Sequence, residues 1–191
     1  MSYDLYCFLP SSDVPSIEEA QAIVESEEAG GKRDNAKSAE TKRKIVRALT
    51  EHNPRLTSFQ FDYAEIARSL KISEDQARSE WTHVELNPPE GDPAIQITVF
   101  GDHVSINIPY RYTGSQADVT FEQLSGYLRV IRGATGFFVY DPQTDRVLDP
   151  EKEEFGDHKS YEQTVREIPN IVAASKLKKR EKPWWRFWSE S

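Results

Sequence analysis

Alternation of apolar and polar residues predicts several short β-strands in the first 150 residues. Residues 3–9 carry aromatic and aliphatic side chains up to Pro10, which is typical of a strand buried on at least one face. Ile95, Ile97 and Val99 alternate with polar residues, and the same alternation returns after a short turn. We therefore expect an antiparallel hairpin. The predicted strands span residues 3–9, 82–87, 94–100, 103–109 and 136–148.

Helical periodicity separates these strands. The capping box Ser16 to Glu19 opens an apolar stripe that should end near Gly30. A second stripe contains Ile45, Val46 and Leu49, and Thr120 to Gln123 is a further capping box that predicts the start of a helix ending at Gly133 or Gly136. The sequence thus predicts an α+β fold, with a mainly antiparallel sheet and helices packed on it.

Residues 61–81 resemble the helix-turn-helix of bacterial transcription factors. Ala67 would lie in the first helix, Ile72 in the turn, and Ser73 would cap the second helix. The second helix begins Ser73-Glu74-Asp75, which places carboxylates where phosphates would be met. We therefore expect a helical hairpin packed on the sheet in preference to a DNA-binding element.

Composition changes along the chain predict three parts. Residues 1–150 contain the strand and helix patterns and form one predicted α+β domain. Residues 151–175 are a predicted linker and helical extension, with an amphipathic pattern from Tyr161 that Pro169 interrupts. Residues 176–191 are a basic aromatic tail.

Charge is unevenly distributed. The net charge is −8, yet residues 176–191 carry six Lys/Arg and two Asp/Glu, which leaves 18 basic and 30 acidic residues in residues 1–175. An acidic body disfavours nucleic-acid binding. Residues 1–31 contain seven Asp/Glu and no Lys/Arg, whereas residues 32–47 contain seven Lys/Arg and two Asp/Glu. The helices in these two segments are expected either to pair electrostatically or to expose solvated faces.

The sequence contains no catalytic signature. The histidines are widely spaced and lack the spacing of a zinc site: His52, His83, His103 and His158. Asp102, Asp141 and Asp145 lie in predicted turns, where a carboxylate commonly bonds nearby backbone N–H groups. We expect no catalytic residue, no metal ligand and no cofactor.

Cys7 is the single cysteine and lies in an apolar run, where we expect it to pack as a small hydrophobic side chain. No disulfide framework is possible within the chain. The sequence has no leader pattern and no apolar run long enough to cross a membrane, so we expect a cytoplasmic protein.

Two segments have the composition of binding surfaces. Aromatic rings alternate with cations in the tail, where the candidates are Trp184, Trp185, Arg186, Phe187 and Trp188. The polar face of the central hairpin supplies the others: Gln96, Thr98, Ser105, Asn107, Tyr110, Arg111 and Tyr112.

The opening Met-Ser-Tyr-Asp-Leu-Tyr, the hairpin strands around Ile97 and Ile106, and the segment Tyr140 to Asp149 resemble small bacterial proteins, some of them immunity proteins of polymorphic toxins. The resemblance covers residues 1–150. It implies a non-enzymatic α+β module whose acidic surface binds a basic, toxin-like protein. The alternative is a peripheral membrane or assembly adaptor that acts through the tail.

Overall fold

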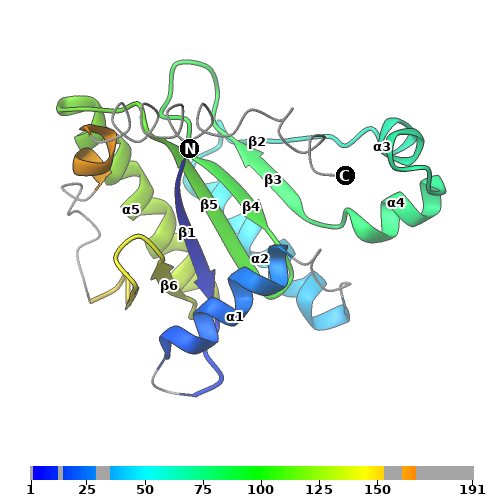
Figure 1. Ribbon diagram of the computed structural model, residues 1–191, viewed down its shortest axis with the longest axis horizontal. Helices are drawn as coiled ribbons and strands as arrows, with labels where there is room; N and C mark the ends of the chain where they lie inside the picture. The colour runs from blue at the N-terminus through cyan, green and yellow to red at the C-terminus, as the bar shows by residue number, and fades with distance from the viewer. Residues whose placement is uncertain (1, 13–14, 29–34, 153–160, 167–191) are drawn as a thin grey trace, which may run out of the picture.

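The computed structural model describes residues 2–12, 15–28, 35–152 and 161–166 (Figure 1). Within these ranges the chain forms a seven-stranded antiparallel sheet with helices on both faces, so the predicted α+β class is confirmed. The strand order is β2-β3-β4-β5-β1-β6-β7. Their bounds are β1 Ser2–Phe8, β2 Thr57–Ser58, β3 Val84–Asn87, β4 Gln96–Val99, β5 His103–Pro109, β6 Phe138–Asp141 and β7 Arg146–Leu148.

The first strand lies in the middle of the sheet. β1 pairs along its whole length with β5 and also pairs with β6. It therefore joins the hairpin β4–β5 to the hairpin β6–β7, and both partners are distant in sequence.

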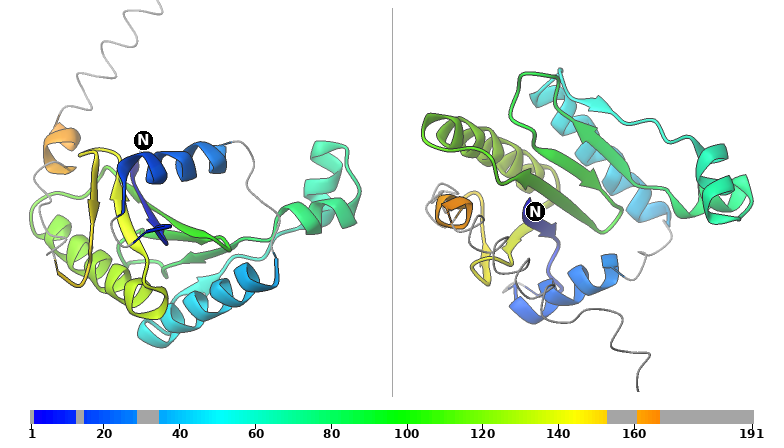
Figure 2. Two further views of the ribbon diagram at one scale, coloured as in Figure 1. Left: turned by 90° about the horizontal axis from the view of Figure 1, so that it is seen from below. Right: turned by 45° about the horizontal axis from the view of Figure 1, so that its top comes forward.

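The main hydrophobic core lies between the sheet and helices α2 (Ala36–His52) and α5 (Ser115–Thr135), as Figure 2 shows. Odd-numbered residues of β1 face this core. Leu5, Cys7 and Ile106 are fully buried. Cys7 is thus packed as predicted, and burial raises the pKa of its thiol, which favours the uncharged form.

Helix α1 (Ile17–Glu28) covers the opposite face beside β1, β6 and β7. Its apolar residues pack against Phe8 and Tyr140, and its first turn is capped as predicted, since the Glu19 N–H donates to Ser16 Oγ at 3.1 Å. Because α1 and α2 lie on opposite faces of the sheet, the alternative in which these two helices pair electrostatically is wrong.

Helices α3 (Tyr63–Leu70) and α4 (Glu74–Glu80) form the predicted helical hairpin. Ser73 caps α4 as predicted, by accepting the Gln76 N–H at 3.0 Å. The hairpin stands beyond the β2–β3 end of the sheet (Figures 1 and 2), so the prediction that it packs on the sheet is wrong. The physical reason is its small apolar content: its buried residues are Ala67 and Ala77.

Helix α5 begins five residues before the predicted capping box. Gly114 is its N-cap residue, and Thr120 is a buried helical residue whose hydroxyl donates to the Gln116 carbonyl at 2.7 Å. The predicted start at Thr120 is therefore wrong. The end at Gly136 is confirmed, because this glycine adopts the left-handed conformation (φ 78°) that commonly ends a helix.

A helical turn at residues 161–166 attaches to the main core. The Tyr161 ring is fully buried beside Tyr3, Tyr110 and Phe121. Residues 153–160 and 167–175 of the predicted extension, which include His158, and the whole basic aromatic tail lie outside the described residues.

Candidate functional site

The face of the sheet opposite the main core carries its side chains in rows across the strands. The register places Thr98 beside Ser105, Ser105 beside Tyr6 and Tyr6 beside Tyr140, which makes a row of hydroxyl groups. In the next row Gln96 lies beside Asn107, and Asn107 lies beside Asp4. Helix α1 covers the β1, β6 and β7 side of this face. The β3–β4–β5 side has no described helix over it (Figures 1 and 2).

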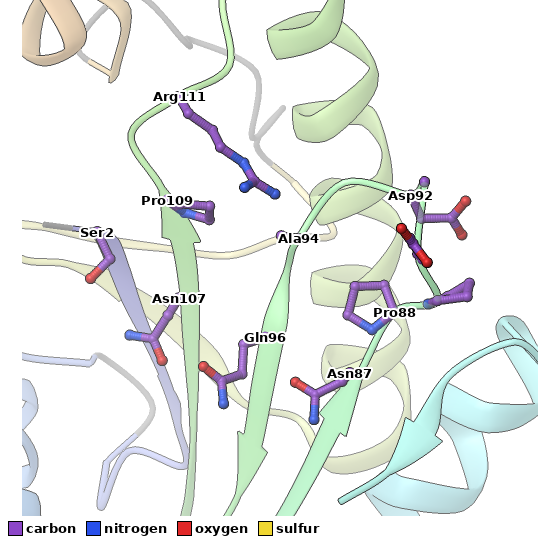
Figure 3. Close-up of a pocket in the computed structure, with 12 residues that line it drawn as sticks. Ser2, Asn87, Pro88, Asp92, Ala94, Gln96, Asn107, Pro109 and Arg111 are labelled. Atoms are coloured by element: carbon purple, nitrogen blue, oxygen red, sulfur yellow. The ribbon is translucent and has the colours of Figure 1, made fainter.

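Carboxylates hold the two central amides of this second row. Asn107 Nδ2 donates to Asp4 Oδ1 at 2.5 Å, and Gln96 Nε2 donates to Glu85 Oε2 at 3.3 Å. When the nitrogen of a carboxamide donates to a carboxylate, the oxygen of the same carboxamide points away from that carboxylate. In Figure 3 the amide oxygens of Asn107 and Gln96 lie on facing sides. The row therefore presents hydrogen-bond acceptors between β4 and β5.

These amides line a groove of about 630 Å³ at the end of the uncovered face. This volume lies in the range of ligand-binding pockets. The groove is lined by Ser2, Asn87, Pro88, Pro89, Glu90, Gly91, Asp92, Ala94, Gln96, Asn107, Pro109 and Arg111 (Figure 3). Three of these residues are carboxamides from three adjacent strands, so the floor of the groove is polar.

Arg111 supplies a positive charge at one end of the groove. Its Nη2 donates to the Tyr112 hydroxyl at 3.1 Å, and its guanidinium carbon lies 5.2 Å from the centre of the Tyr112 ring. The same hydroxyl accepts the Ala94 N–H at 2.6 Å, which fixes it to the groove wall. Within the described part of the chain no carboxylate forms an ion pair with Arg111, so this cation is available to an anionic group.

Acidic groups lie on the loop between β3 and β4. Asp92 pairs with Arg55 at 3.1 Å, and Glu90 is exposed. Glu90 and Asp92 line the groove, and Asp4 and Glu85 lie beside its amides, so four carboxylates lie in or next to the groove. Arg111 and Arg55 oppose them, so the local charge favours a cation over most of the groove.

The far end of the same face is aromatic. The Phe100 ring stacks on His103 with centroids 4.3 Å apart and contacts His83 at 5.3 Å. Each histidine has a carboxylate neighbour: Asp102 lies 2.7 Å from His103, and Glu85 lies 3.4 Å from His83. These histidines pack as part of the sheet face. Across the described ranges, no group of three His, Cys, Asp or Glu side chains is placed to hold a metal ion.

The turn aspartates also have structural partners. Asp141 accepts the Tyr3 hydroxyl at 2.5 Å and the Gln143 N–H at 2.9 Å, and Asp145 accepts the Tyr140 hydroxyl at 3.0 Å. The predicted turn role is confirmed for Asp141, which in addition joins the β6–β7 turn to β1.

The predicted hairpin surface is divided by the fold. Gln96, Asn107 and Arg111 line the groove. Tyr110 instead stacks on Tyr161 with centroids 5.2 Å apart, at the edge of the main core. The Tyr112 hydroxyl accepts a hydrogen bond from the Arg111 side chain.

Sequence reasoning missed Asn87, Asp92 and Asp4. Asn87 ends β3 directly before Pro88, and the β3–β4 register, extended by one residue, places it beside Gln96. The alternation of Val84 and Leu86 in the sequence could have predicted that Asn87 lies at the end of this strand. Asp4 reaches the groove floor because β1 inserts beside β5, which no local pattern indicates.

No helix in the described ranges is both long and apolar enough to cross a membrane. Comparisons with protein-family models, with curated proteins and with solved structures give no match. The fold and the groove therefore show an antiparallel α+β protein. Its sheet has a polar face that the described helices cover only in part.

Proposed function

We propose that this protein is a non-enzymatic protein-binding module and that the groove on the β3–β4–β5 side of the sheet is its partner site. The observation that carries the proposal is the row of fixed amides on this side. A half-buried polar face that no described helix covers is suited to hydrogen bonds with another molecule.

The partner that we propose is a basic protein. Residues 1–175 carry 30 acidic and 18 basic residues, and carboxylates surround the groove. Complementary charge speeds encounter and selects partners more than it raises affinity. An immunity-like role, in which the module blocks a basic toxin, agrees with this charge and with the family resemblance of residues 1–150.

Affinity capture from the source organism tests this proposal. Three immobilised baits are compared: the full chain, a chain ending at Ser175, and the full chain with Gln96→Arg, which adds a bulky cation to the groove. We expect one stoichiometric protein on the first two baits and its loss on the third. The matched control is Gln116→Arg, the same exchange at an exposed position of α5. Equal capture by Gln96→Arg and Gln116→Arg would reject the groove as the partner site.

A second candidate function rests on the tail sequence. Six Lys/Arg in residues 176–191 contribute about 1 kcal/mol each near an anionic membrane, and Trp184, Trp185 and Trp188 add apolar area. Peripheral attachment predicts co-sedimentation with phosphatidylserine vesicles that disappears when the three tryptophans become alanine. Sedimentation of this triple variant at the level of the native chain would reject the tail as a membrane anchor.

A further inference from the structure

The groove combines hydrogen-bond acceptors with the Arg111 guanidinium, which forms no ion pair with a carboxylate of the described residues, and this combination restricts its ligand. The inference below rests on the proposed function and specifies the chemistry of the partner segment. We propose that the groove binds an extended polypeptide segment, with a lysine or arginine side chain between Gln96 and Asn107 and a carboxylate at Arg111.

The amide row selects the cation. Asp4 and Glu85 take the side-chain N–H groups of Asn107 and Gln96, at 2.5 and 3.3 Å, and leave the amide oxygens facing the space between the two strands. Adjacent strands are about 4.8 Å apart, so one ammonium or guanidinium group can donate to both oxygens. The two carboxylates beside the amides add a negative potential that favours a charged donor over a neutral one.

Arg111 selects the anion. It reaches into the groove from the segment that follows β5, and Tyr112 fixes it through a hydrogen bond at 3.1 Å. A guanidinium in this position forms paired hydrogen bonds with a carboxylate. The carboxylate belongs to an acidic side chain or to the end of the partner chain.

The pentapeptide acetyl-Ala-Ala-Lys-Ala-Ala with a free terminal carboxylate is the probe. Its binding to the ¹⁵N-labelled full chain is followed through the side-chain NH₂ signals of Gln96 and Asn107 and the Nε–H signal of Arg111. We expect saturable shifts of all three signals at millimolar peptide. A norleucine replacing the lysine should remove the amide shifts, and a terminal carboxamide should remove the Arg111 shift.

Matched variants tie the shifts to the groove. Gln96→Leu keeps the side-chain size and removes one acceptor, so we expect about tenfold weaker binding. Asp4→Asn replaces the charged acceptor of the Asn107 amide by a neutral one, and it should weaken binding of the lysine peptide while leaving binding of the norleucine peptide unchanged. Gln116→Leu on α5 should bind as the native chain does. The backbone amide spectrum of each variant shows that it is folded.

Two results would overturn this inference: no shift of the Gln96 and Asn107 signals at millimolar peptide, or equal shifts with lysine and norleucine. If either occurs while Gln96→Arg still abolishes capture of the partner, the groove remains the partner site and the cation chemistry is wrong. If the peptide binds and capture is unaffected by Gln96→Arg, the groove binds cations and the proposed function fails.

Discussion

The Asn107 side chain on β5 donates a hydrogen bond to the Asp4 carboxylate on β1, with 2.5 Å between Nδ2 and Oδ1, across 103 positions of sequence. The bond joins the central hairpin to the inserted first strand. It also fixes the direction of an amide in the groove.

Loss of this bond should lower stability moderately. Asp4→Asn replaces a charged acceptor by a neutral one, and both residues are half-buried, so we expect a loss of about 1 kcal/mol in the free energy of unfolding. Urea unfolding measures it. Glu122→Gln on the exposed side of α5 is the control and should change stability little. An unchanged midpoint for Asp4→Asn would contradict a stabilising role of the bond.

Arg132 and Asp149 make stability depend on pH. Burial opposes ionisation of Asp149, but hydrogen bonds from Arg132 and from the Glu151 N–H outweigh it and hold the pKa of Asp149 below its ordinary value of 3.8. Its ionised form therefore stabilises the fold above the unfolded-state pKa, and this contribution is lost as the pH falls through the lower folded-state pKa.

At neutral pH we expect Asp149→Asn to lower the free energy of unfolding by about 1.5–3 kcal/mol, because the pair is largely buried. The difference from the native chain should narrow as the pH falls below 3.8. Urea unfolding across this pH range measures it. A difference that stays constant in acid would show that the ionised carboxylate is not the source.

Gly126 marks a close approach of α5 to α2. A Cβ at this position would lie 3.1 Å from His52 Nε2. Alanine favours a helix over glycine by about 1 kcal/mol, but here the His52 ring, which contacts Tyr127 edge-on, must shift to make room for the methyl group. We expect Gly126→Ala to raise the free energy of unfolding of the native chain only slightly. In a His52→Ala background the same exchange should give the full increase. A double-mutant cycle measures the difference, and equal gains in the two backgrounds would contradict the contact.

Tyr161 holds residues 161–166 on the body through its hydroxyl. This group donates to the Pro109 carbonyl at 2.6 Å and accepts the N–H groups of Arg111 and Tyr112 at 3.2 and 3.1 Å. Burial raises the pKa of this phenol, so it stays a donor at neutral pH.

Tyr161→Phe removes the hydroxyl that accepts the Tyr112 N–H, whereas the Arg111 N–H and the Pro109 carbonyl remain bonded to each other at 2.8 Å. We expect a loss of about 1–3 kcal/mol in the free energy of unfolding. Hydrogen exchange of the Arg111 and Tyr112 amides should accelerate in this variant. Tyr63→Phe in the distant α3 is the control. Unchanged exchange at Arg111 and Tyr112 would show that the hydroxyl does not hold this segment.

Local pattern was enough to predict most of the secondary structure. The alternation in residues 95–108 gave the hairpin β4–β5, and the stripe from Ile17 to Val24 gave α1 with its cap. These signals depend on neighbours in sequence. The start of α5 was missed because Gly114 provides no side-chain cap, while Thr120 and Gln123 match a capping pattern inside the helix.

The contacts between segments distant in sequence could not be predicted from local patterns. The central place of β1, the opposite faces taken by α1 and α2, and the position of the α3–α4 hairpin all depend on pairing between distant segments. The groove depends on them too. Gln96, Asn107 and Arg111 were candidates from their hairpin, but Asp4 and Asn87 join them only through strand order.

We predict that a basic protein binds the polar β3–β4–β5 face, over which no described helix lies. The most direct test is titration calorimetry of the captured partner against the native chain, Gln96→Arg and Gln116→Arg. The account predicts that Gln96→Arg weakens binding at least tenfold, about 1.4 kcal/mol, while Gln116→Arg matches the native chain. Equal dissociation constants for all three proteins would contradict it and place the partner site elsewhere.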